Sequence, residues 1–356
     1  MKKIFCAAFC ALFFAACLFF ALGAFIGSEN AEAEGRELAA FPAWTTEEGG
    51  FNSAFFTEFD AWLTDHFSLR SALITLDSRI KAKLFATGTD EVILGRDDFL
   101  FLADTAADFT GESAMTDEEI AACADALAAL SEHAAQYGAK LLFTAAPNKS
   151  TVYPEKMPAA YRRTDAPTNM DRLYAALQER GVLYADLREA LSGTDALLYH
   201  RRDTHWNGIG ALAAYNALFD TMGIAHETYA EYPLVTTADF RGDLDELLYP
   251  SAELYDENTL PDAQLDSRFI YTSNTLSPMD MIITTRGKGE AKLLVFRDSF
   301  GSALIPYLSA ACAEVRYERA VPYRIDMLKQ FPADWVIVEI AERNLPVLIE
   351  QIALNP

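Results

Sequence analysis

The chain has 356 residues, of which 51% are hydrophobic, 23% charged and 12% aromatic. This composition is typical of a globular protein with an additional apolar segment, and it excludes a largely disordered chain. The formal net charge is −23, which argues against nucleic acid as a partner because a polyanion would be repelled. A neutral or locally contacted substrate fits this charge better.

An apolar run occupies residues 4–26, with Lys2 and Lys3 before it and several glutamates after it. As a helix rising ~1.5 Å per residue, this run would reach about 34 Å and cross a bilayer. The positive flank predicts a single-pass anchor in the cytoplasmic membrane, with the N-terminus inside and the body outside the cytoplasm. The alternative is a secretory signal cleaved near residues 31–33, which would release the body. We expect the anchor and its linker to cover residues 1–35.

Three of the five cysteines lie in the apolar run, which leaves Cys123 and Cys312 in the body. Neither a disulfide framework nor a cysteine motif typical of a metal site is present. The sequence leaves open whether Cys123 and Cys312 form a bridge or remain two buried thiols.

The first part of the body favours helices and one hairpin. Apolar residues recur at helical spacing over 51–85, which predicts one or two amphipathic helices. Two short apolar runs around Gly95 predict a β-hairpin over 91–102. Thr116 and Glu119 form a capping box that begins a helix ending near Gly138.

Short apolar strands and amphipathic helices then alternate. The predicted strands are 140–145, 182–187, 197–200, 292–296, an edge strand at 316–321, and 334–341. The predicted helices are 166–180, 207–219, one from about 302, and 343–354. This alternation indicates a mainly parallel sheet covered by helices on both faces, within a single domain over residues 36–356.

Residues 226–290 depart from the alternation and are rich in tyrosine and acidic side chains. We expect this segment to be a long insertion close to the functional site. In sheets of this kind the ligand crevice lies beyond the carboxyl ends of the strands.

The sequence RDSFG at 297–301 follows the predicted strand 292–296. A serine at a strand-to-helix turn is exposed above the sheet, and amides at the start of the helix can stabilise an oxyanion. Ser299 is therefore a candidate nucleophile, although a serine at a helix start is also a common N-cap.

The sequence RRDTHWNGIG at 201–210 supplies a base and an acid. Asp203 and His205, two residues apart on an extended segment, would point to the same side, so that Asp203 could orient His205 toward a serine. A hydrogen-bonded loop histidine or half of a metal site would look the same. Because no cluster of ligands at metal spacing accompanies His205, we expect no metal and no other cofactor.

Together, DTHWN at 203–207 and RDSF at 297–300 resemble the DHHW family and the related alginate O-acetyltransferase proteins of the SGNH hydrolase superfamily. The segments EFDAWLTDHFSLR, GRDDFLFL, PNKSTVYPEKMP and VEIAERNL are also similar to segments of that family. Thr204 stands where the name DHHW has a histidine, which brings the chain nearer the alginate type. Arg297 stands where related nucleophile motifs have glycine, and we expect it to contact the oxyanion or the substrate.

This resemblance implies a flavodoxin-like α/β/α sandwich with a Ser-His-Asp triad. Asp203 would be the orienting acid, His205 the general base and Ser299 the nucleophile that becomes acetylated. The implied function is O-acetyl transfer to a cell-envelope or exported polysaccharide. The alternatives are an acetylesterase with the same triad and a non-catalytic polysaccharide-binding or assembly protein. A donor from the cytoplasm would require a membrane acyl-transporting partner.

Other residues have two interpretations each. Asn148 would complete an oxyanion hole or belong to an ordinary turn, and Lys149 would bind substrate or pair with a carboxylate. Trp206 would stack on a sugar or belong to the core. Glu339 and Arg343 would orient the serine turn as a bidentate pair or form a structural salt bridge.

Overall fold

The computed structural model describes residues 7, 9–15, 18, 39–46, 49–66, 70–85 and 87–353. Within these residues, no helix combines the length and the apolar character needed to cross a membrane. The predicted anchor over residues 4–26 falls largely outside the described residues. The chain divides into two compact units, residues 1–89 with 245–253, and residues 90–244 with 254–356. The predicted domain bounds of 1–35 and 36–356 stay a prediction.

The helices α2 (Phe55–His66) and α3 (Arg70–Phe85) belong to the first unit. Aromatic side chains of α2 pack along one side of the helix, where Phe55 stacks on Phe59 and Phe59 stacks on Trp62. The spacing of three and four residues between them explains why they share a face. The sequence left open one or two helices here, and the structure has two.

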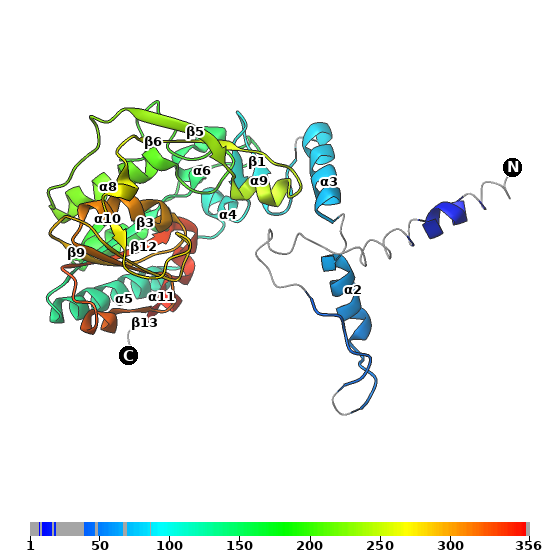
Figure 1. Cartoon of the computed structure of the whole chain (residues 1–356), viewed down its shortest axis with the longest axis horizontal. Helices are drawn as coiled ribbons and strands as arrows, with labels where there is room; N and C mark the ends of the chain where they lie inside the picture. Colours follow the sequence, from blue (N-terminus) through cyan, green and yellow to red (C-terminus); the bar gives the residue numbers. More distant parts are fainter. Residues whose placement is uncertain are drawn as a thin grey trace. The chain divides into compact units, whose positions relative to one another are not determined.

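The second unit is built on a seven-stranded sheet in the order β4-β3-β12-β9-β10-β8-β7 (Figure 1). Its strands are β3 (Lys140–Ala146), β4 (Tyr184–Asp186), β7 (Ile270–Tyr271), β8 (Ile282–Arg286), β9 (Lys292–Phe296), β10 (Glu314–Glu318) and β12 (Trp335–Ala341). The first five in the spatial order are parallel to one another, whereas β8 pairs antiparallel with both of its neighbours, β10 and β7. The predicted mainly parallel sheet is therefore confirmed.

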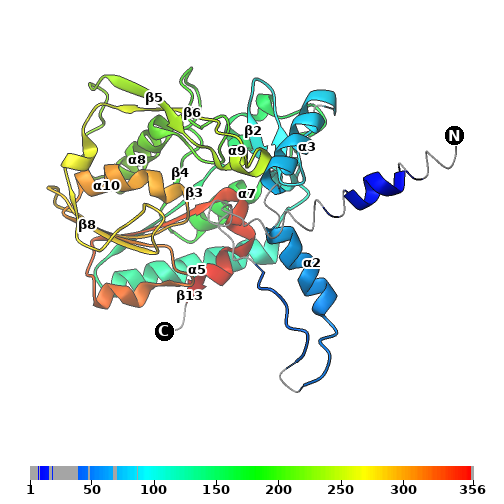
Figure 2. The same cartoon turned by 45° about the vertical axis from the view of Figure 1, so that its right-hand side comes forward.

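Helices cover both faces of this sheet (Figure 2). On one face lie α8 (Gly208–Met222) and α10 (Ile305–Ala311), and on the other lie α5 (Asp117–Gln136), α7 (Asn169–Glu179) and α11 (Leu348–Gln351). Alternate residues of each strand belong to opposite cores: Leu142 packs with the α8 side, and Leu141 and Phe143 pack with the α5 side. This alternation follows from the two-residue period of a β-strand.

The helices begin where the sequence supplies caps. The Thr116 side chain accepts from the Glu119 amide at the start of α5, which confirms the predicted capping box. A second capping box, Thr168 with Asp171, starts α7, and Asn207 caps α8 by accepting from the Gly210 amide. The capping of α8 fixes the chain immediately after His205.

The remaining elements are short. The predicted hairpin is confirmed as β1 (Val92–Leu94) paired with β2 (Leu100–Leu102). The other short elements are α4 (Thr105–Thr110), α6 (Lys149–Val152), η1 (Pro154–Lys156), η3 (Phe300–Leu304), β11 (Tyr323–Arg324), η4 (Ile325–Lys329), η5 (Glu342–Val347) and β13 (Ile352–Ala353).

Residues 226–290 form several elements rather than an unstructured loop. They supply the antiparallel pair β5 (Leu234–Phe240) and β6 (Asp256–Pro261), then α9 (Asp243–Leu248), η2 (Leu265–Ser267), β7 and β8. Because β8 pairs with β10, the prediction of an edge strand at 316–321 was wrong: β10 lies inside the sheet.

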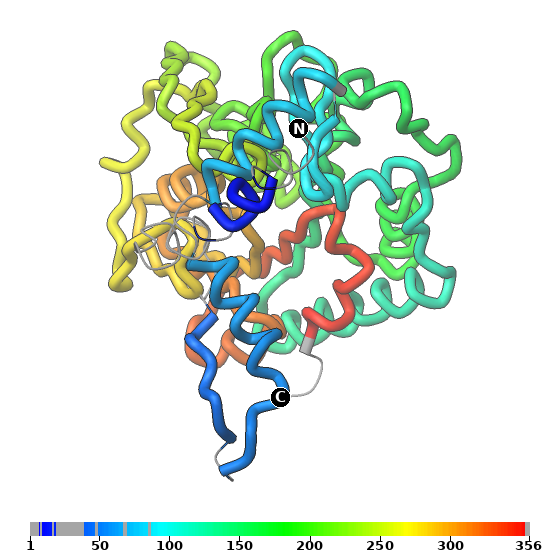
Figure 3. Tube along the Cα trace, turned by 90° about the vertical axis from the view of Figure 1, so that its right-hand side faces the viewer, coloured from blue at the N-terminus to red at the C-terminus, as the bar shows by residue number. Residues whose placement is uncertain are grey.

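Two further predictions need correction. Residues 197–200 form no strand and make only an isolated bridge between Tyr199 and Trp206. The predicted closing helix over 343–354 is divided into η5, α11 and β13, because Pro346 removes a donor needed for a regular helix. Figure 3 shows this C-terminal segment (red) running beside α5 (teal), with which α11 is in contact.

Candidate active site

The candidate site lies at the carboxyl ends of the parallel strands. Ser299 follows β9, Asn148 and Lys149 follow β3, and Glu339 lies in the last part of β12. Parallel strands end at the same edge of a sheet, so their following loops gather there. The segment before α8 brings Asp203 and His205 to the same place.

Asp298 holds the turn that presents Ser299. Its carboxylate accepts hydrogen bonds from the Phe300 amide at 2.9 Å and from the Ala341 amide at 2.6 Å, which ties the turn to the end of β12. The Ser299 side chain makes no capping hydrogen bond to the helix that follows. The cap interpretation of this serine is therefore unsupported, and its hydroxyl faces His205 instead.

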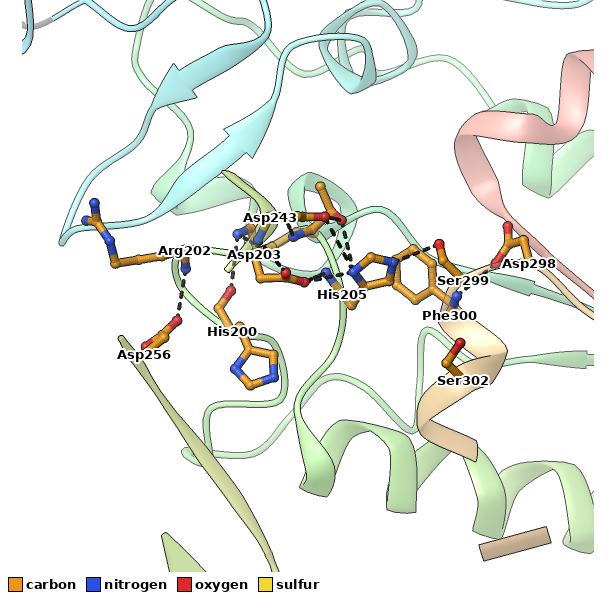
Figure 4. Close-up of polar contacts among 12 residues, drawn as sticks. His200, Arg202, Asp203, His205, Asp243, Asp256, Asp298, Ser299, Phe300 and Ser302 are labelled. Atoms are coloured by element: carbon orange, nitrogen blue, oxygen red, sulfur yellow. Dashed lines mark hydrogen bonds and ion pairs between the residues drawn. The ribbon is translucent and has the colours of Figure 1, made fainter. Parts of the chain in front are cut away.

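His205 lies between Asp203 and Ser299 (Figure 4). Its Nε2 atom is 2.8 Å from Ser299 Oγ, and its Nδ1 atom is 2.8 Å from Asp203 Oδ1. The segment is a bend and not the extended chain that the sequence suggested, since Asp203 Oδ1 also accepts the His205 amide at 2.7 Å. One carboxylate oxygen thus fixes both the backbone and the ring of His205.

Electrostatics in this group favour a charged Asp203 beside a basic His205. Burial raises the pKa of Asp203, but the hydrogen bond and charge of His205 outweigh it and hold that pKa well below its ordinary value. Burial lowers the pKa of His205, but its hydrogen bond to Asp203 and the charges of Asp203 and Asp243 raise the pKa above 6.5. A histidine with a raised pKa is a stronger proton acceptor.

Asp243, which the sequence analysis missed, is a second carboxylate beside His205. Its Oδ2 atom lies 3.6 Å from His205 Nδ1, and its amide donates to Asp203 Oδ2 at 2.8 Å. Burial and the charge of Asp203 raise the pKa of Asp243 to about 6. A Gly-Asp pair ahead of an apolar run marks the start of α9 in the sequence, but nothing in the pattern relates it to His205.

Asp203, His205 and Asp243 have ligand atoms within 4.8 Å of one another, a spacing that could hold a metal ion. However, the carboxylate oxygens are already used. Both oxygens of Asp203 accept hydrogen bonds, and those of Asp243 accept from the amide and hydroxyl of Thr204. A metal ion would have to displace these bonds, so the donor set favours orientation of His205 over metal binding.

Lys149 fixes the loop that carries Asp203. Its buried Nζ donates to the carbonyl oxygens of His200 at 3.1 Å, Arg201 at 2.9 Å and Asp203 at 2.6 Å. Burial lowers the pKa of Lys149 to about 7. The predicted alternatives were a substrate contact or a carboxylate partner, and the structure instead gives Lys149 three backbone carbonyls.

Arg297 is also buried and engaged. Its guanidinium donates to Ser302 Oγ at 2.8 Å and to the carbonyl oxygens of Pro278 at 2.5 Å and Asp280 at 3.3 Å. Burial lowers the pKa of Arg297 to about 10. The residue predicted to contact substrate therefore connects the serine turn to the loop at 278–280.

Asn148 and Trp206 are both buried, although Trp206 also contributes to the wall of the cavity beside Ser299. Asn148 is 1% exposed, and its side-chain amide donates to Asp108 at 3.0 Å. Trp206 is also 1% exposed and packs edge-on against Phe300. The turn interpretation of Asn148 and the core interpretation of Trp206 fit this burial better than an oxyanion hole or a sugar-stacking wall.

Glu339 and Arg343 do not pair with each other. Glu339 is fully buried and accepts from the Asp298 amide at 3.2 Å, and burial raises its pKa well above the ordinary value. The Arg343 guanidinium lies 5.5 Å from the centre of the Phe300 ring. Glu339 thus contacts the serine turn through the Asp298 amide, and neither of the two predicted forms of a Glu339–Arg343 pair is present.

A cavity of about 780 Å³ opens beside Ser299 and His205. Much of its lining comes from β5, β6 and the segment 262–279, so the predicted proximity of residues 226–290 to the site is met by these side chains. His200, another residue missed by the sequence analysis, lines the cavity and stacks on Phe240 with ring centres 3.8 Å apart. Only the tertiary fold brings these residues to Ser299.

Residues 92–267 match the family model of the SGNH hydrolase-like domain of acetyltransferase AlgX. This segment includes Asp203, His205 and Asp243, whereas Ser299 lies beyond it. A protein of Pseudomonas putida named probable alginate O-acetylase AlgJ is 27% identical over 248 residues, which cover 63% of this chain and 61% of that protein. The chain thus aligns with about three fifths of the length of this curated relative.

Two solved structures share the fold. A DHHW family protein from Eubacterium siraeum is 16% identical with a TM-score of 0.50, covering 66% of this chain and 90% of that one. PatB1 of Bacillus cereus, in a structure with a sulfonyl adduct, is 16% identical with a TM-score of 0.54, covering 74% and 100%. Residues 92–267 are thus similar to the SGNH hydrolase-like domain of acetyltransferase AlgX, and the resemblance predicted from the motifs is confirmed.

Proposed function

We propose that this chain is a serine-dependent O-acetyltransferase that acts outside the cytoplasm on a cell-envelope or exported polysaccharide. The observation that carries the proposal is the hydrogen-bonded series from Asp203 through His205 to Ser299, with 2.8 Å at both steps. A nucleophile, a base and an orienting acid at these distances are what acyl transfer through a serine requires. The names of the relatives, an O-acetylase and an acetyltransferase, agree with this chemistry.

The reaction has two balanced steps. Ser299 Oγ attacks the carbonyl carbon of an acetyl ester, the Oγ proton passes to His205 Nε2, and the ester C–O bond breaks as that proton moves to the leaving oxygen. A sugar hydroxyl then attacks acetyl-Ser299, gives its proton to His205 and releases Ser299 with its proton restored. Asp203 stabilises the transient imidazolium through Nδ1.

Location and partners belong to the same proposal. The apolar run at 4–26 with lysines before it supports a membrane anchor with the body outside the cytoplasm. An acetyl donor made in the cytoplasm would then require a membrane acyl-transporting partner. Protease added to intact cells should degrade the body, while a cytoplasmic control protein survives; survival of the body would refute the proposed location.

The activity is tested with the full chain and a chromogenic acetyl ester, with and without neutral and uronate oligosaccharides. Ser299→Ala and His205→Ala should each lower kcat/KM by about 10³-fold or more, because each removes a reacting group. Ser267→Ala is the matched control, because Ser267 lines the same cavity but donates to the Gln264 carbonyl.

Acetylated sugar formed in the presence of an acceptor identifies a transferase, whereas acetate released at an unchanged rate identifies an esterase. If wild type and both variants are equally inert toward the ester, the catalytic proposal fails, and polysaccharide binding without catalysis becomes the better account.

A further inference from the structure

Arg343 lies beside the candidate nucleophile and base. Its guanidinium is 5.5 Å from the centre of the Phe300 ring, and Phe300 directly follows Ser299 in the chain. The centre of the Phe300 ring is in turn 4.7 Å from that of the His205 ring. The charge of Arg343 also acts on His205, because it opposes the rise in the His205 pKa that the carboxylates cause. Arg343 therefore belongs to the surroundings of the reacting pair.

The backbone on both sides of Arg343 is fastened to the serine turn. Asp298 Oδ2 accepts a hydrogen bond from the Ala341 amide at 2.6 Å and another from Asn344 Nδ2 at 3.3 Å. Asp298 is the residue immediately before Ser299. The segment that carries Arg343 is thus held in a fixed position relative to the nucleophile, which a group acting on the reacting atoms requires.

The Arg343 guanidinium has donors to offer. Among the residues that the structure describes, it pairs with no carboxylate and donates to no oxygen, and its contact is the face of the Phe300 ring. The other cations of the site are already used, since Lys149 donates to three backbone carbonyls and Arg297 donates to the loop at 278–280. A guanidinium carries five N–H donors, and Arg343 is only half-buried.

The Ser299 amide is a second donor without an acceptor in the described part of the chain. The amides on either side of it are used: that of Asp298 donates to Glu339, and that of Phe300 donates to the Asp298 carboxylate. A backbone amide and a cationic side chain beside a nucleophile are groups from which an oxyanion hole is built.

We propose that Arg343 is a catalytic residue which, together with the Ser299 amide, binds the carbonyl oxygen of the acetyl ester. This proposal rests on the proposed acyl transfer through Ser299. As Ser299 Oγ bonds to the carbonyl carbon, the π electron pair of the C=O bond moves to the carbonyl oxygen, and the Arg343 cation stabilises the negative charge formed there. The C=O bond forms again as the ester C–O bond breaks, and the leaving oxygen takes the proton held by His205.

The position of Arg343 favours this oxygen over a more distant group of the substrate. Arg343 does not line the large cavity beside Ser299, so a sugar bound in that cavity would not meet the guanidinium first. The group that Ser299 and Arg343 can share is the carbonyl that reacts.

The experiment compares Arg343→Met with wild type, using the full chain and p-nitrophenyl acetate. Methionine keeps an unbranched apolar side chain against Phe300 but has no charge and no N–H donor. Because loss of one oxyanion donor costs about 10²–10³-fold in rate, kcat/KM should fall about 100-fold or more. The matched control is Arg286→Met, since Arg286 pairs with Glu314 at the amino ends of the strands, the edge opposite the serine. It should keep the wild-type kcat/KM.

The pH–rate profile separates this role from an electrostatic effect on His205 alone. Removing a cation near the imidazole raises its pKa, so the rising limb of kcat/KM should move to higher pH in Arg343→Met in either case. Only the loss of an oxyanion donor also lowers the plateau above that limb. A plateau equal to that of wild type overturns the proposal.

Arg343→Lys keeps the test valid if Arg343→Met is merely misfolded. Lysine lacks the guanidinium but retains a cation, so its plateau should lie about tenfold or more above that of Arg343→Met. Equal plateaus in the two variants would refute a role for the positive charge. If wild type itself is as inert as Ser299→Ala, the proposed function falls together with this proposal. If turnover depends on Ser299 while Arg343→Met remains fully active, only the role of Arg343 falls.

Discussion

At the scale of single residues, His205 is the centre of the site because two carboxylates face one of its ring nitrogens. Asp203 makes the direct hydrogen bond at 2.8 Å, and Asp243 lies at 3.6 Å. Asp243 also accepts two hydrogen bonds from Thr204, the residue between the acid and the base. The negative charge around the imidazole therefore comes from two segments of the chain.

Removing the Asp243 charge should shift the pH profile in a defined direction. The base must be neutral to accept the serine proton, so kcat/KM for the acetyl ester should rise with pH through the pKa of His205. The charge of Asp243 contributes to raising that pKa. In Asp243→Asn the rising limb should therefore lie at lower pH than in wild type, which a pH–rate profile measures.

The control for this profile is Asp262→Asn, because Asp262 lies at the cavity wall and is not among the groups that raise the pKa of His205. If the rising limb of the pH–rate profile lies at the same pH in Asp243→Asn as in wild type, or at higher pH, Asp243 does not act on His205 electrostatically.

Replacing Lys149 gives a second prediction at the scale of single residues. Its three carbonyl acceptors belong to residues 200, 201 and 203, and it lies 5.4 Å from the centre of the Phe101 ring. Lys149→Met leaves these buried carbonyls without a donor, which destabilises the fold. It also removes a buried charge, which offsets part of this cost. We expect the free energy of unfolding to fall by about 2 kcal/mol in total. Urea unfolding measures this loss, and ester turnover should fall at least tenfold.

Lys156→Met is the comparison, because Lys156 pairs with the exposed Asp97. That pair should contribute less than about 1 kcal/mol. Equal turnover in Lys149→Met and wild type would mean that Asp203 keeps its position without the lysine.

At the scale of elements, the approach of Asp243 to the bend at 201–205 depends on Gly242. A Cβ atom at residue 242 would collide with the Arg202 carbonyl. The absence of a side chain lets the start of α9 approach, so that the Asp243 amide reaches Asp203 Oδ2. A backbone contact thus positions the second carboxylate.

Gly242→Ala should disturb this approach. The backbone carbonyl cannot move as a flexible side chain would, so the start of α9 must shift and Asp243 must move with it. We expect kcat/KM for the acetyl ester to fall at least tenfold, measured under the conditions used for wild type. Gly50→Ala, where the nearest atom would be 3.7 Å away, should have no effect; a fully active Gly242→Ala would contradict this account.

The elements also show how far the sequence could predict the fold. Strands such as 140–145 and 334–341 are continuous apolar runs, because both of their faces are buried, and they were predicted correctly. The run at 197–200 is apolar for another reason: Leu198 and Tyr199 are buried against the core without a strand partner on either side. Composition alone does not separate these two causes of burial.

At the scale of the whole molecule, the sheet separates two cores that the sequence could not assign. Cys123 lies in the core on the α5 side and Cys312 in the core on the α8 side. Both are free thiols, so the bridge that the sequence left open is not formed. Burial raises the pKa of Cys312 to about 12, which makes its reactive thiolate scarce.

This separation predicts slow thiol chemistry in the folded protein. Cys123 and Cys312 should resist alkylation by iodoacetamide at pH 8 and should both react once guanidinium chloride unfolds the chain. Peptide mass spectrometry identifies the modified cysteines, and glutathione added to the same reaction serves as the positive control for alkylation. Rapid alkylation of either buried thiol without denaturant would contradict this packing.

The site is assembled from segments that lie far apart in the chain, which limits how much of it the sequence could predict. Asp203, His205 and Ser299 could be predicted as site residues because short motifs carry them. Asp243, His200 and the cavity wall lie in no such motif, and they meet the serine only after residues 226–290 fold against α8 and η3. Arg297 and Lys149 were predicted to contact the oxyanion or the substrate, but the sequence did not show that both side chains are buried and hydrogen-bonded within the protein.

Arg297 has a consequence for evolution and for engineering. Arg297 lies just before the serine turn, and its guanidinium donates to the carbonyl oxygens of Pro278 and Asp280. Pro278 and Met279 form part of the cavity wall. The loop in the cavity wall and the turn that carries Ser299 therefore share one buried anchor. Under the proposed function, substitutions at 278–280 should change ligand preference and rate together, whereas substitutions in β5 and β6, which this anchor does not contact, should change ligand preference alone.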